Sequence, residues 1–434
     1  MTTVTVVGTG YVGLIQGVCL AKLGHDVTCV DIDAEKVARM RAGVPPIHEP
    51  DLKELLEAGI AAGNLRFETP EDGWADLIGD VVFVAVGTPM SENGAADLSF
   101  VRTVADSLSA EATKPFTLVM KSTVPPGTGS ALRDRQLTRA GVEIGYVSNP
   151  EFLREGHAIH DWFNTDRVVI GGDDARAIDQ VAELYVSLDA PIVVTDVASA
   201  ETIKYASNAF LSTKISFINE IANLCDAVGA DIDAVSGGIG LDARIGSAFL
   251  QAGIGYGGSC FPKDTRALDF IATMNGYQFD LLKAVIDVNN RQRLLPLIQL
   301  TRAIPNLWER KVAILGLAFK PHTDDVRESP ALDIVPLLVE EGADVVTCDP
   351  FAGAVHLPGS TRVDDIWEAI EGSSAVVLVT EWPEFLALDW ARVRRVMSEP
   401  AIVFDGRNAL DAAAVTAAGL TYMGVGRHGA HRTA

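Results

Sequence analysis

The stretch from residue 3 to Asp31 constrains the fold more than any other part of the chain. A short β-branched run at residues 3–7 leads directly into Gly8-Thr-Gly-Tyr-Val-Gly13. A helical pattern closed by Gly24 follows, and a second strand pattern ends at Asp31. A G-x-G-x-x-G turn between a strand and a helix, with an acid after the next strand, is the fingerprint of a dinucleotide-binding βαβ unit. The sequence therefore predicts a Rossmann-like domain at the N-terminus.

Each residue of this fingerprint has its own expected role. Gly8 would make the tight turn, Gly10 would admit a pyrophosphate to the helix N-terminus, and Gly13 would let the helix approach the strand. Asp31 would accept hydrogen bonds from the adenosine ribose and repel a 2′-phosphate, which favours NAD over NADP. A flavin site or a nucleotide-binding relic is the alternative reading of the same turn.

Strands and helices continue to alternate up to about residue 198. Apolar runs at 81–86, 116–120, 142–147, 168–170 and 192–195 are typical of buried parallel strands. Polar loops with proline and glycine follow several of them, where α/β sheets build their ligand sites.

One long helix is expected from residue 199 to about 228. Lys204 and Asn208 are four residues apart and off its apolar stripe, so they would project together, although a solvated face is the preferred reading of that spacing alone. The helix could be a connector, a dimer interface or both. The stripe recurs at three- and four-residue spacing and consists of Ile203, Ala206, Phe210, Phe217, Ile221, Leu224 and Val228.

A glycine-rich loop at 253–264 ends in Cys260, followed by Lys263 and Asp264. Pro262 suits the first turn of a helix, which would place the thiol at a helix N-terminus near a cation. Such a setting favours a thiolate nucleophile, whereas a buried structural cysteine is the simpler reading of one cysteine alone.

A second, smaller α/β domain is expected from residue 304 to 425, with strand patterns at 311–316, 344–348, 375–379 and 402–404. It lacks the full glycine fingerprint. The predicted organisation is an α/β fold of two Rossmann-like doubly wound domains (1–198 and 304–425) joined by a long central helix and a helical middle region (199–303). Residues 426–434 are expected to form a flexible tail.

Composition narrows the class of partner and the compartment. The net charge of −23 disfavours nucleic acid and anionic membranes as partners. We expect no signal peptide, because the first strand starts so close to Met1, and no apolar run is long enough for a membrane span. The five scattered cysteines form no C-x-x-C pair, which favours a reducing, cytoplasmic location and argues against a metal site.

Six blocks of sequence, taken together, resemble the UDP-glucose/GDP-mannose dehydrogenase family over residues 6–427. They are Gly8-Thr-Gly-Tyr-Val-Gly-Leu14, Lys121-Ser-Thr-Val-Pro-Pro-Gly-Thr128, Asn149-Pro-Glu-Phe-Leu-Arg-Glu-Gly156, Ala200-Glu-Thr-Ile-Lys204 with Asn208, Gly255-Tyr-Gly-Gly-Ser-Cys-Phe-Pro-Lys-Asp264 and Asp405-Gly-Arg407. His48 departs from the tyrosine of many relatives.

The resemblance implies a four-electron oxidation of UDP-glucose to UDP-glucuronate with NAD, by an enzyme that dimerises through the central helix. Cys260 would trap the aldehyde as a thiohemiacetal and then carry a thioester. Lys204 and Asn208 would stabilise oxyanion charge, and Asp264 with Thr123 and a bound water would move protons in the alcohol step. The first proton acceptor could be Thr123 with the water, Asp264 or Lys204. Glu151 would act as a base or position water for hydrolysis.

The resemblance also implies two sets of binding residues. Those near NAD are Gly8, Gly10, Tyr11, Val12, Gly13, Asp31, Lys36, Thr88, Thr123, Glu155, Lys263 and Arg327. Those near the UDP-sugar are Glu151, Phe152, Leu153, Glu155, Lys204, Asn208, Arg244, Phe249, Tyr256, Gly257, Phe319, Lys320 and Arg407, with Arg244 reaching the neighbouring subunit.

Three alternatives stay open. GDP-mannose or a UDP-N-acetylhexosamine could be the substrate of the same chemistry. A two-electron dehydrogenase of β-hydroxyacids would share the dinucleotide domain and the long helix but would need no cysteine. A nucleotide-sugar sensor would bind without turnover, and it would be expected to lack Cys260 or Lys204.

Overall fold

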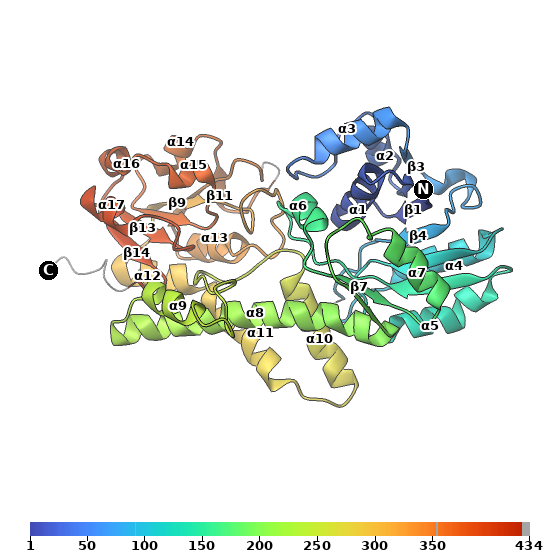
Figure 1. Cartoon of the computed structure of the whole chain (residues 1–434). Helices are drawn as coiled ribbons and strands as arrows, with labels where there is room; N and C mark the ends of the chain where they lie inside the picture. The colour runs from blue at the N-terminus through green and yellow to red at the C-terminus, as the bar shows by residue number, and fades with distance from the viewer. Residues whose placement is uncertain (92, 353–354, 428–434) are drawn as a thin grey trace. The chain divides into compact units, whose positions relative to one another are not determined.

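The structure is a computed structural model that describes residues 1–91, 93–352 and 355–427. It divides into two compact units, Met1–Ser207 and Asn208–Ala434, each with its own sheet (Figure 1). Over the described part of the chain, no helix is long and apolar enough to cross a membrane.

The first unit is built on a sheet with the order β3-β2-β1-β4-β5-β6-β7-β8. Neighbouring strands pair in parallel, except that β6 and β7 meet in an antiparallel bridge between Ser148 and Gly171. The strands are β1 (Thr3–Val7), β2 (Asp26–Val30), β3 (Leu65–Glu68), β4 (Val81–Val84), β5 (Phe116–Met120), β6 (Ile144–Ser148), β7 (Val168–Gly171) and β8 (Ile192–Thr195).

Two hydrophobic cores cover the faces of this sheet. Leu14 and Leu56 belong to one core, whereas Val101 and Leu132 belong to the other. Because β4 and β5 are buried along their whole length, their sequences are continuous apolar runs rather than alternating ones. The helices are α1 (Tyr11–Lys22), α2 (Ala34–Arg41), α3 (Leu52–Ala62), α4 (Ser99–Glu111), α5 (Thr128–Arg135), α6 (Ala158–Phe163) and α7 (Ala175–Glu183).

The second unit contains a parallel sheet with the order β11-β10-β9-β12-β13-β14. Its strands are β9 (Lys311–Leu315), β10 (Asp344–Cys348), β11 (Ser360–Arg362), β12 (Ala375–Leu378), β13 (Ile402–Asp405) and β14 (Thr421–Gly424). The first strand again lies at the centre, between the second and the fourth. The predicted α/β class with two Rossmann-like sheets and a long helix is therefore confirmed.

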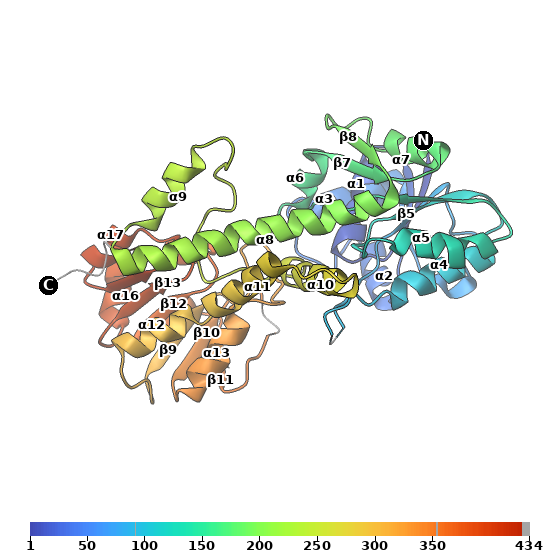
Figure 2. The same ribbon diagram turned by 90° about the horizontal axis from the view of Figure 1, so that it is seen from below.

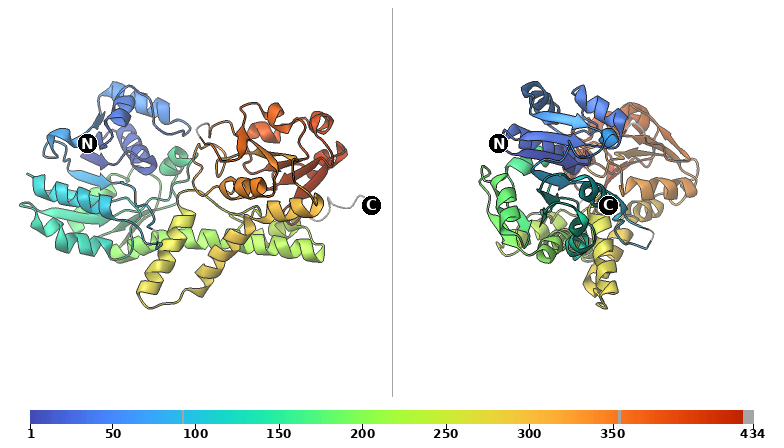
Figure 3. Two further views of the ribbon diagram at one scale, coloured as in Figure 1. Left: turned by 180° about the vertical axis from the view of Figure 1, so that it is seen from behind. Right: turned by 90° about the vertical axis from the view of Figure 1, so that its right-hand side faces the viewer.

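Helices of the second unit pack on this sheet or extend from it. α10 and α11 contact each other as a helical hairpin, drawn in yellow in Figure 3. The helices are α9 (Ile232–Gly240), α10 (Phe261–Met274), α11 (Asp280–Gln292), α12 (Leu295–Ala303), α13 (Ala331–Glu340), α14 (Ile366–Ile370), α15 (Pro383–Leu386), α16 (Trp390–Val396) and α17 (Ala412–Ala417).

The long helix α8 (Val197–Val228) runs without interruption through the boundary of the two units (Figure 2). The buried and exposed faces of α8 are not the ones that its apolar stripe predicts. In the second unit the apolar stripe is exposed, with Phe210 66%, Phe217 53%, Leu224 54% and Val228 67% accessible. Lys204 and Asn208 are only 3% and 5% accessible, so the solvated-face alternative is wrong for them.

The expected tail starts too early. Gly426 donates a backbone hydrogen bond to Asp226, and the Arg427 side chain donates four hydrogen bonds within the second unit. Because these groups are satisfied by the fold, the chain is ordered through Arg427. Residues 428–434 lie outside the described residues.

Candidate active site

The turn after β1 has the geometry that its glycines predict. Gly8 has a φ of +90°, and a Cβ on Gly13 would lie 1.9 Å from the Gly8 carbonyl oxygen. These two glycines are therefore required by the protein itself. Gly10 differs, because a Cβ there would meet nothing within 4 Å. The open space beside Gly10, at the start of α1, fits the close approach of a pyrophosphate.

Asp31 lies at the end of β2, beside this turn. Its carboxylate accepts hydrogen bonds from the Thr9 amide (2.9 Å) and hydroxyl (2.5 Å), and it pairs with Lys36 at 2.9 Å. Burial alone would raise the pKa of Asp31, but the bonds from Thr9 and Lys36 outweigh it and lower the pKa to about 2. A permanently ionised acceptor at this place fits the ribose of NAD.

The loops at the carboxyl ends of β4, β5 and β6 lock one another in place. The Thr88 hydroxyl donates to the Thr123 carbonyl at 3.0 Å. Glu49, buried in the Pro46–Pro50 segment, accepts from the amides of Gly156 (2.7 Å) and Ala158 (2.6 Å) and from the Tyr11 hydroxyl. Glu49 thus joins the dinucleotide turn to the start of α6, a role that the sequence did not reveal.

Glu151 and Lys204 form a buried ion pair in the first unit. Their atoms Oε1 and Nζ are 2.8 Å apart, and the side chains are only 6% and 4% accessible. Burial would raise the pKa of Glu151, but Lys204, the Leu153 amide and Lys121 together lower it. The ring of Phe152 lies 5.4 Å from the Lys204 ammonium. Glu151 is therefore an ionised carboxylate held against a cation.

Side-chain amides hold the glycine-rich loop in the second unit. Asn219 on α8 accepts from the Gly253 amide (2.9 Å), and Gln292 on α11 donates to the Gly253 carbonyl (2.8 Å). Asn289 bonds both backbone groups of Tyr256 (2.8 and 3.1 Å). An irregular buried backbone needs such partners because no ladder satisfies it. The loop is therefore a fixed surface.

Cys260 stands at the N-cap position of α10, half-buried, with its sulfur 3.5 Å from the Ser259 hydroxyl. Asp264 lies in the first turn of that helix and is 1% accessible. One oxygen of Asp264 accepts from Asn208 on α8 (2.6 Å), and the other pairs with Lys263 (2.6 Å). The thiol is thus accessible at a helix N-terminus, beside a carboxylate whose orientation is fixed.

A cavity of about 320 Å³ opens in front of the glycine loop, within the second unit. Arg407 contributes a guanidinium that is mostly shielded from water, with its side chain 15% accessible, and that donates to the carbonyls of Val379 (2.6 Å), Phe319 (2.8 Å) and Gly255 (3.2 Å). Its carboxylate neighbour Glu381 is 3.5 Å away. The lining consists of Ile215, Asn219, Phe249, Gln251, Ala252, Gly253, Gly255, Tyr256, Gly257, Phe261, Phe319, Glu381 and Arg407. Aromatic walls and a shielded cation fit a base attached to a phosphate.

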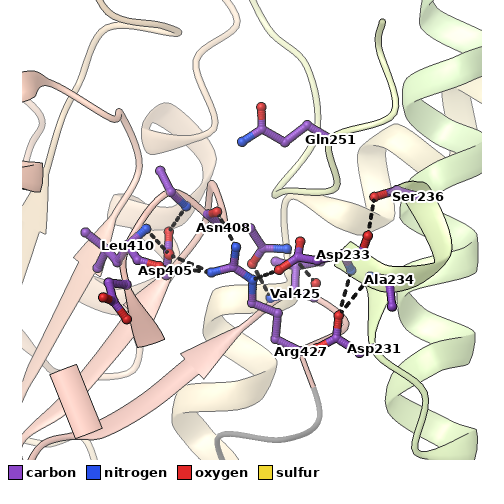
Figure 4. Close-up of polar contacts among 12 residues, drawn as sticks. Asp231, Asp233, Ala234, Ser236, Gln251, Asp405, Asn408, Leu410, Val425 and Arg427 are labelled. Atoms are coloured by element: carbon purple, nitrogen blue, oxygen red, sulfur yellow. Dashed lines mark hydrogen bonds and ion pairs between the residues drawn. The ribbon is translucent and has the colours of Figure 1, made fainter. Parts of the chain in front are cut away.

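Arg427 binds the turn at residues 405–410, and Figure 4 shows it beside Asp233, Asp405 and Asn408. Arg427 donates to the carbonyls of Asn408 (2.6 Å) and Leu410 (3.1 Å) and pairs with Asp233 of α9 at 2.8 Å. Asp405, fully buried, accepts from the Arg407 amide at 3.1 Å. The position of the cavity-lining arginine therefore depends on the last residue of the chain that the structure describes.

The remaining predicted residues are divided between the two units. Val12 lies in α1, and Phe152, Leu153 and Glu155 lie half-buried in the loop between β6 and α6. In the second unit, Lys320 approaches the ring of Phe319 (5.3 Å) but is outside the cavity lining. Arg244 is 90% accessible and bound to Asp242, and Arg327 is bound to Asp325. These two arginines are at the surface of their unit.

Sequence reasoning missed the residues that support the site: Glu49, Asn219, Asn289, Gln292, Glu381 and Arg427. Their partners are distant in sequence, so spacing gives no signal for them. Among the residues with described positions, no group of three or more His, Cys, Asp or Glu could hold a metal ion.

Comparison with known proteins covers nearly the whole chain. The UDP-glucose/GDP-mannose dehydrogenase family matches with its NAD binding domain at residues 2–189, its central domain at 198–291 and its UDP binding domain at 313–412.

Individual relatives agree with this match. The UDP-glucose 6-dehydrogenase YwqF of Bacillus subtilis is 47% identical, covering 98% of this chain and 97% of its own. A UDP-glucose 6-dehydrogenase of Rhizobium meliloti is 45% identical, covering 98% and 99%. The structure of a UDP-glucose dehydrogenase from Pyrobaculum islandicum superimposes with a TM-score of 0.90 at 40% identity, over 98% of both chains. With the NAD-binding turn, the cysteine loop and the match over all three domains in place, this chain belongs to the UDP-glucose/GDP-mannose dehydrogenase family, and its cofactor is NAD.

Proposed function

We propose that the chain oxidises the C6 alcohol of UDP-glucose to the carboxylate of UDP-glucuronate. The observation that carries the proposal is the accessible thiol of Cys260 at the start of α10, in a chain with an NAD-binding domain. Oxidation of an alcohol only to a carbonyl needs no such nucleophile. Oxidation to an acid uses one, because the thiolate holds the aldehyde as a thiohemiacetal, and the thioester that its oxidation leaves is then hydrolysed.

Cys260 gives the reaction its covalent course. NAD supplies the hydride acceptor at each of the two oxidations. The Cys260 thiolate adds to the aldehyde carbon, which forms a C–S bond and a thiohemiacetal. Loss of a hydride from that carbon leaves a thioester. Water then adds to the thioester carbon, the C–S bond breaks, and the thiol returns as the acid leaves.

Polar side chains serve the separate steps. Asp264, fixed by Asn208 and Lys263, and Thr123 move the alcohol proton with a water. Lys204 and Asn208, four residues apart on α8, stabilise the oxyanion. Because the pKa of Glu151 is lowered, its carboxylate positions the hydrolytic water better than it removes a proton.

The UDP moiety is assigned to the cavity of the second unit. Arg407 provides the cation for the diphosphate, and Phe249, Tyr256, Gly257 and Phe319 provide the surrounding surface. In the first unit, Asp31 and Lys36 hold the adenosine ribose, with Thr88 and Thr123 nearer the nicotinamide end. This assignment gives residues 1–198 to NAD, 199–303 to the cysteine and dimerisation, and 304–425 to UDP.

The sugar of the substrate is inferred from the sequence identities of the relatives. The relatives named UDP-glucose 6-dehydrogenase reach 47% identity, whereas a UDP-D-ManNAc dehydrogenase structure from Pyrococcus horikoshii shares 27% at a TM-score of 0.87. The higher identity favours UDP-glucose over an N-acetylated sugar or GDP-mannose.

The active form is a homodimer in this proposal. Phe210, Phe217, Leu224 and Val228 form an exposed apolar face on α8, and exposed apolar faces of this kind mark protein–protein contacts. A second copy covers it, and Arg244, exposed at the surface and paired with Asp242, reaches the neighbouring subunit's sugar. Phe217→Glu should give a monomer in light scattering, while an exposed-site control, Val186→Glu, should leave the dimer intact. If the wild-type protein is a monomer in light scattering, the proposed interface is wrong. All five cysteines are thiols rather than disulfides, which supports a reducing cytoplasm.

The deciding experiment is the ratio of NADH formed to UDP-glucose consumed. The proposal requires a ratio near two, with UDP-glucuronate as product. The turnover of Cys260→Ala should be several orders of magnitude lower than that of the wild type, because the catalytic residues depend on the covalent nucleophile. A ratio near one with released aldehyde, or full activity of Cys260→Ala, contradicts the proposal. GDP-mannose and UDP-N-acetylhexosamines, assayed in parallel, settle the sugar.

A further inference from the structure

A buried amine lies beside the Glu151–Lys204 pair and has no role in the reaction described so far. Lys121 follows the last residue of β5 and is only 5% accessible. Its ammonium nitrogen donates to the Asn149 side-chain oxygen at 3.0 Å and approaches the Tyr185 hydroxyl at 3.4 Å. A lysine is rarely buried, because transferring its charge out of water costs free energy.

Lys121 is part of a hydrogen-bonded chain inside the first unit. Trp162 donates to Gln16 of α1 (2.9 Å), and Gln16 donates to Tyr185 (2.9 Å). Tyr185 and Lys121 both donate to the same side-chain oxygen of Asn149, and the side-chain nitrogen of Asn149 donates to the Val169 carbonyl (2.7 Å). The chain therefore runs from the dinucleotide-binding helix to the turn that carries Glu151.

The turn leaves little freedom between Lys121 and Glu151. Asn149 and Glu151 are separated only by Pro150, whose ring restricts the backbone. The Asn149 amide is also bound to the Met120 carbonyl at 2.9 Å, directly before Lys121. A change in the Lys121–Asn149 bond is thus passed to Glu151 through a short, stiff segment.

The charges around Lys121 make its protonation consequential. Glu151, Lys204 and the phenol of Tyr185 are the titratable groups that face it. Burial lowers the pKa of Lys121 to about 7, Glu151 acts against that lowering, and Lys204 adds to it. With Lys121 neutral, Glu151 and Lys204 form a balanced pair. With Lys121 charged, two buried cations compete for one carboxylate.

We propose that Lys121 is a positioning residue for Glu151, which acts as a neutral hydrogen-bond donor to Asn149 and slows thioester hydrolysis when it becomes charged. The inference rests on the proposed function, since it assigns Lys121 to the hydrolysis step. Lys121 touches neither substrate nor cofactor in this account. It acts by keeping Glu151 against Lys204.

Two substitutions separate the neutral from the charged state. Lys121→Gln keeps a neutral donor at similar length, and Lys121→Arg keeps a permanent cation. The exposed Lys114→Gln is the matched control in the same strand region. For each folded variant, turnover is measured against pH, and the acyl-enzyme is quantified by intact-protein mass after quenching.

The wild type should lose turnover on acidification with a midpoint near the pKa of Lys121. Lys121→Gln should lack that acid limb and keep turnover within about threefold of wild type at alkaline pH. Lys121→Arg should be about tenfold or more slower at every pH and accumulate the thioester. The KM for NAD should not move in either variant.

An unchanged acid limb in Lys121→Gln overturns the inference, as does an equal loss of turnover at every pH in both variants. The wild-type ratio of NADH to UDP-glucose is measured first. A ratio near one contradicts the proposed function. A ratio near two, with an acid limb in Lys121→Gln equal to that of the wild type, contradicts only the role of Lys121.

Discussion

The two sheets of this protein share a strand order and differ in the turn that follows the first strand. In both sheets the central order is third, second, first, fourth, fifth, sixth strand. In the first unit, β1 ends at Val7 and α1 begins at Tyr11. In the second unit, β9 ends at Leu315 and α13 begins only at Ala331. A short turn aims a helix N-terminus at the sheet edge, and a long one does not.

The residues at equivalent positions of the two turns show the same contrast. Gly10 of the first unit has open space where a Cβ would be. Gly316 of the second unit, with a φ of +101° and a Cβ position 2.3 Å from the Thr380 hydroxyl, corresponds to the equally tight Gly8, because each directly follows the first strand. Ala318, 0% accessible, stands in the place of Gly10. The space that admits a pyrophosphate in one turn is filled by protein in the other.

The acids after the second strand diverge as well. Asp31 receives part of its hydrogen bonding from the side chain of Lys36, which is 23% accessible. Asp349, 2% accessible, accepts from the amides of Leu317 (2.7 Å) and Ala318 (3.0 Å) and from the Trp382 indole (3.1 Å). Asp349 therefore holds its own turn together. One sheet order supports two ligand modes, because the turn and the acid decide which ligand can enter.

The largest expected effect follows from the glycine contrast. Gly316→Ala should lower the free energy of unfolding by about 3 kcal/mol, from overpacking against Thr380 and a strained φ. Gly10→Ala should change stability by less than about 1 kcal/mol and weaken NAD binding about a hundredfold. Calorimetric melting and NAD titration measure both. Tight NAD binding by Gly10→Ala would break the comparison.

The second effect follows from the acids. Asp349→Asn should cost about 2 kcal/mol of stability, since the amide cannot accept all of its present donors. Asp31→Asn should cost less and should instead weaken NAD about tenfold, with smaller discrimination against NADP. Chemical denaturation of the two variants measures the loss of stability, and cofactor titration measures their affinity for NAD and NADP. Equal stability losses in both variants would show that Asp31 is also structural.

The smallest effect is a pH dependence confined to the first unit. Glu201, 2% accessible, accepts from the amides of Gly127 (2.6 Å) and Gly129 (2.8 Å) at the start of α5. Burial raises the pKa of Glu201 from 4.5 to about 7, against the effect of these bonds. The folded state therefore binds more protons, so this contribution to stability is complete below pH 4.5 and is lost as pH rises to about 7.

Glu201→Gln should remove that slope. Melting temperatures of the variant and the wild type, compared across the same pH window, give the measurement. A wild-type slope retained in Glu201→Gln would assign it to other groups.

The sequence predicted the first turn because its glycines are fixed by local geometry, as the 1.9 Å approach at Gly13 demonstrates. The strands were recognisable because both faces of the sheet are buried, which makes them continuous apolar runs. The apolar stripe of α8 was also found, but the second unit buries a different face, on which Asn208 and Asn219 lie among Ile218, Ala222 and Cys225. Polar residues can occupy a buried face when the site needs them, and periodicity does not report that.

The supporting groups were out of reach of sequence reasoning. Asn219, Asn289 and Gln292 satisfy a loop whose backbone has no regular pairing, and each is many residues away from it. Arg427 was assigned to a tail, yet it holds the turn of Arg407. Such contacts follow from the assembled fold rather than from local pattern.

The division of ligands between the two units is the central claim, and hydrogen–deuterium exchange of the full chain tests it most directly. NAD alone should slow exchange in the turn at residues 8–13 and leave 253–258 and 405–408 unchanged. UDP alone should do the reverse. Protection of the same segments by both ligands, or protection of residues 316–320 by NAD, would contradict the account.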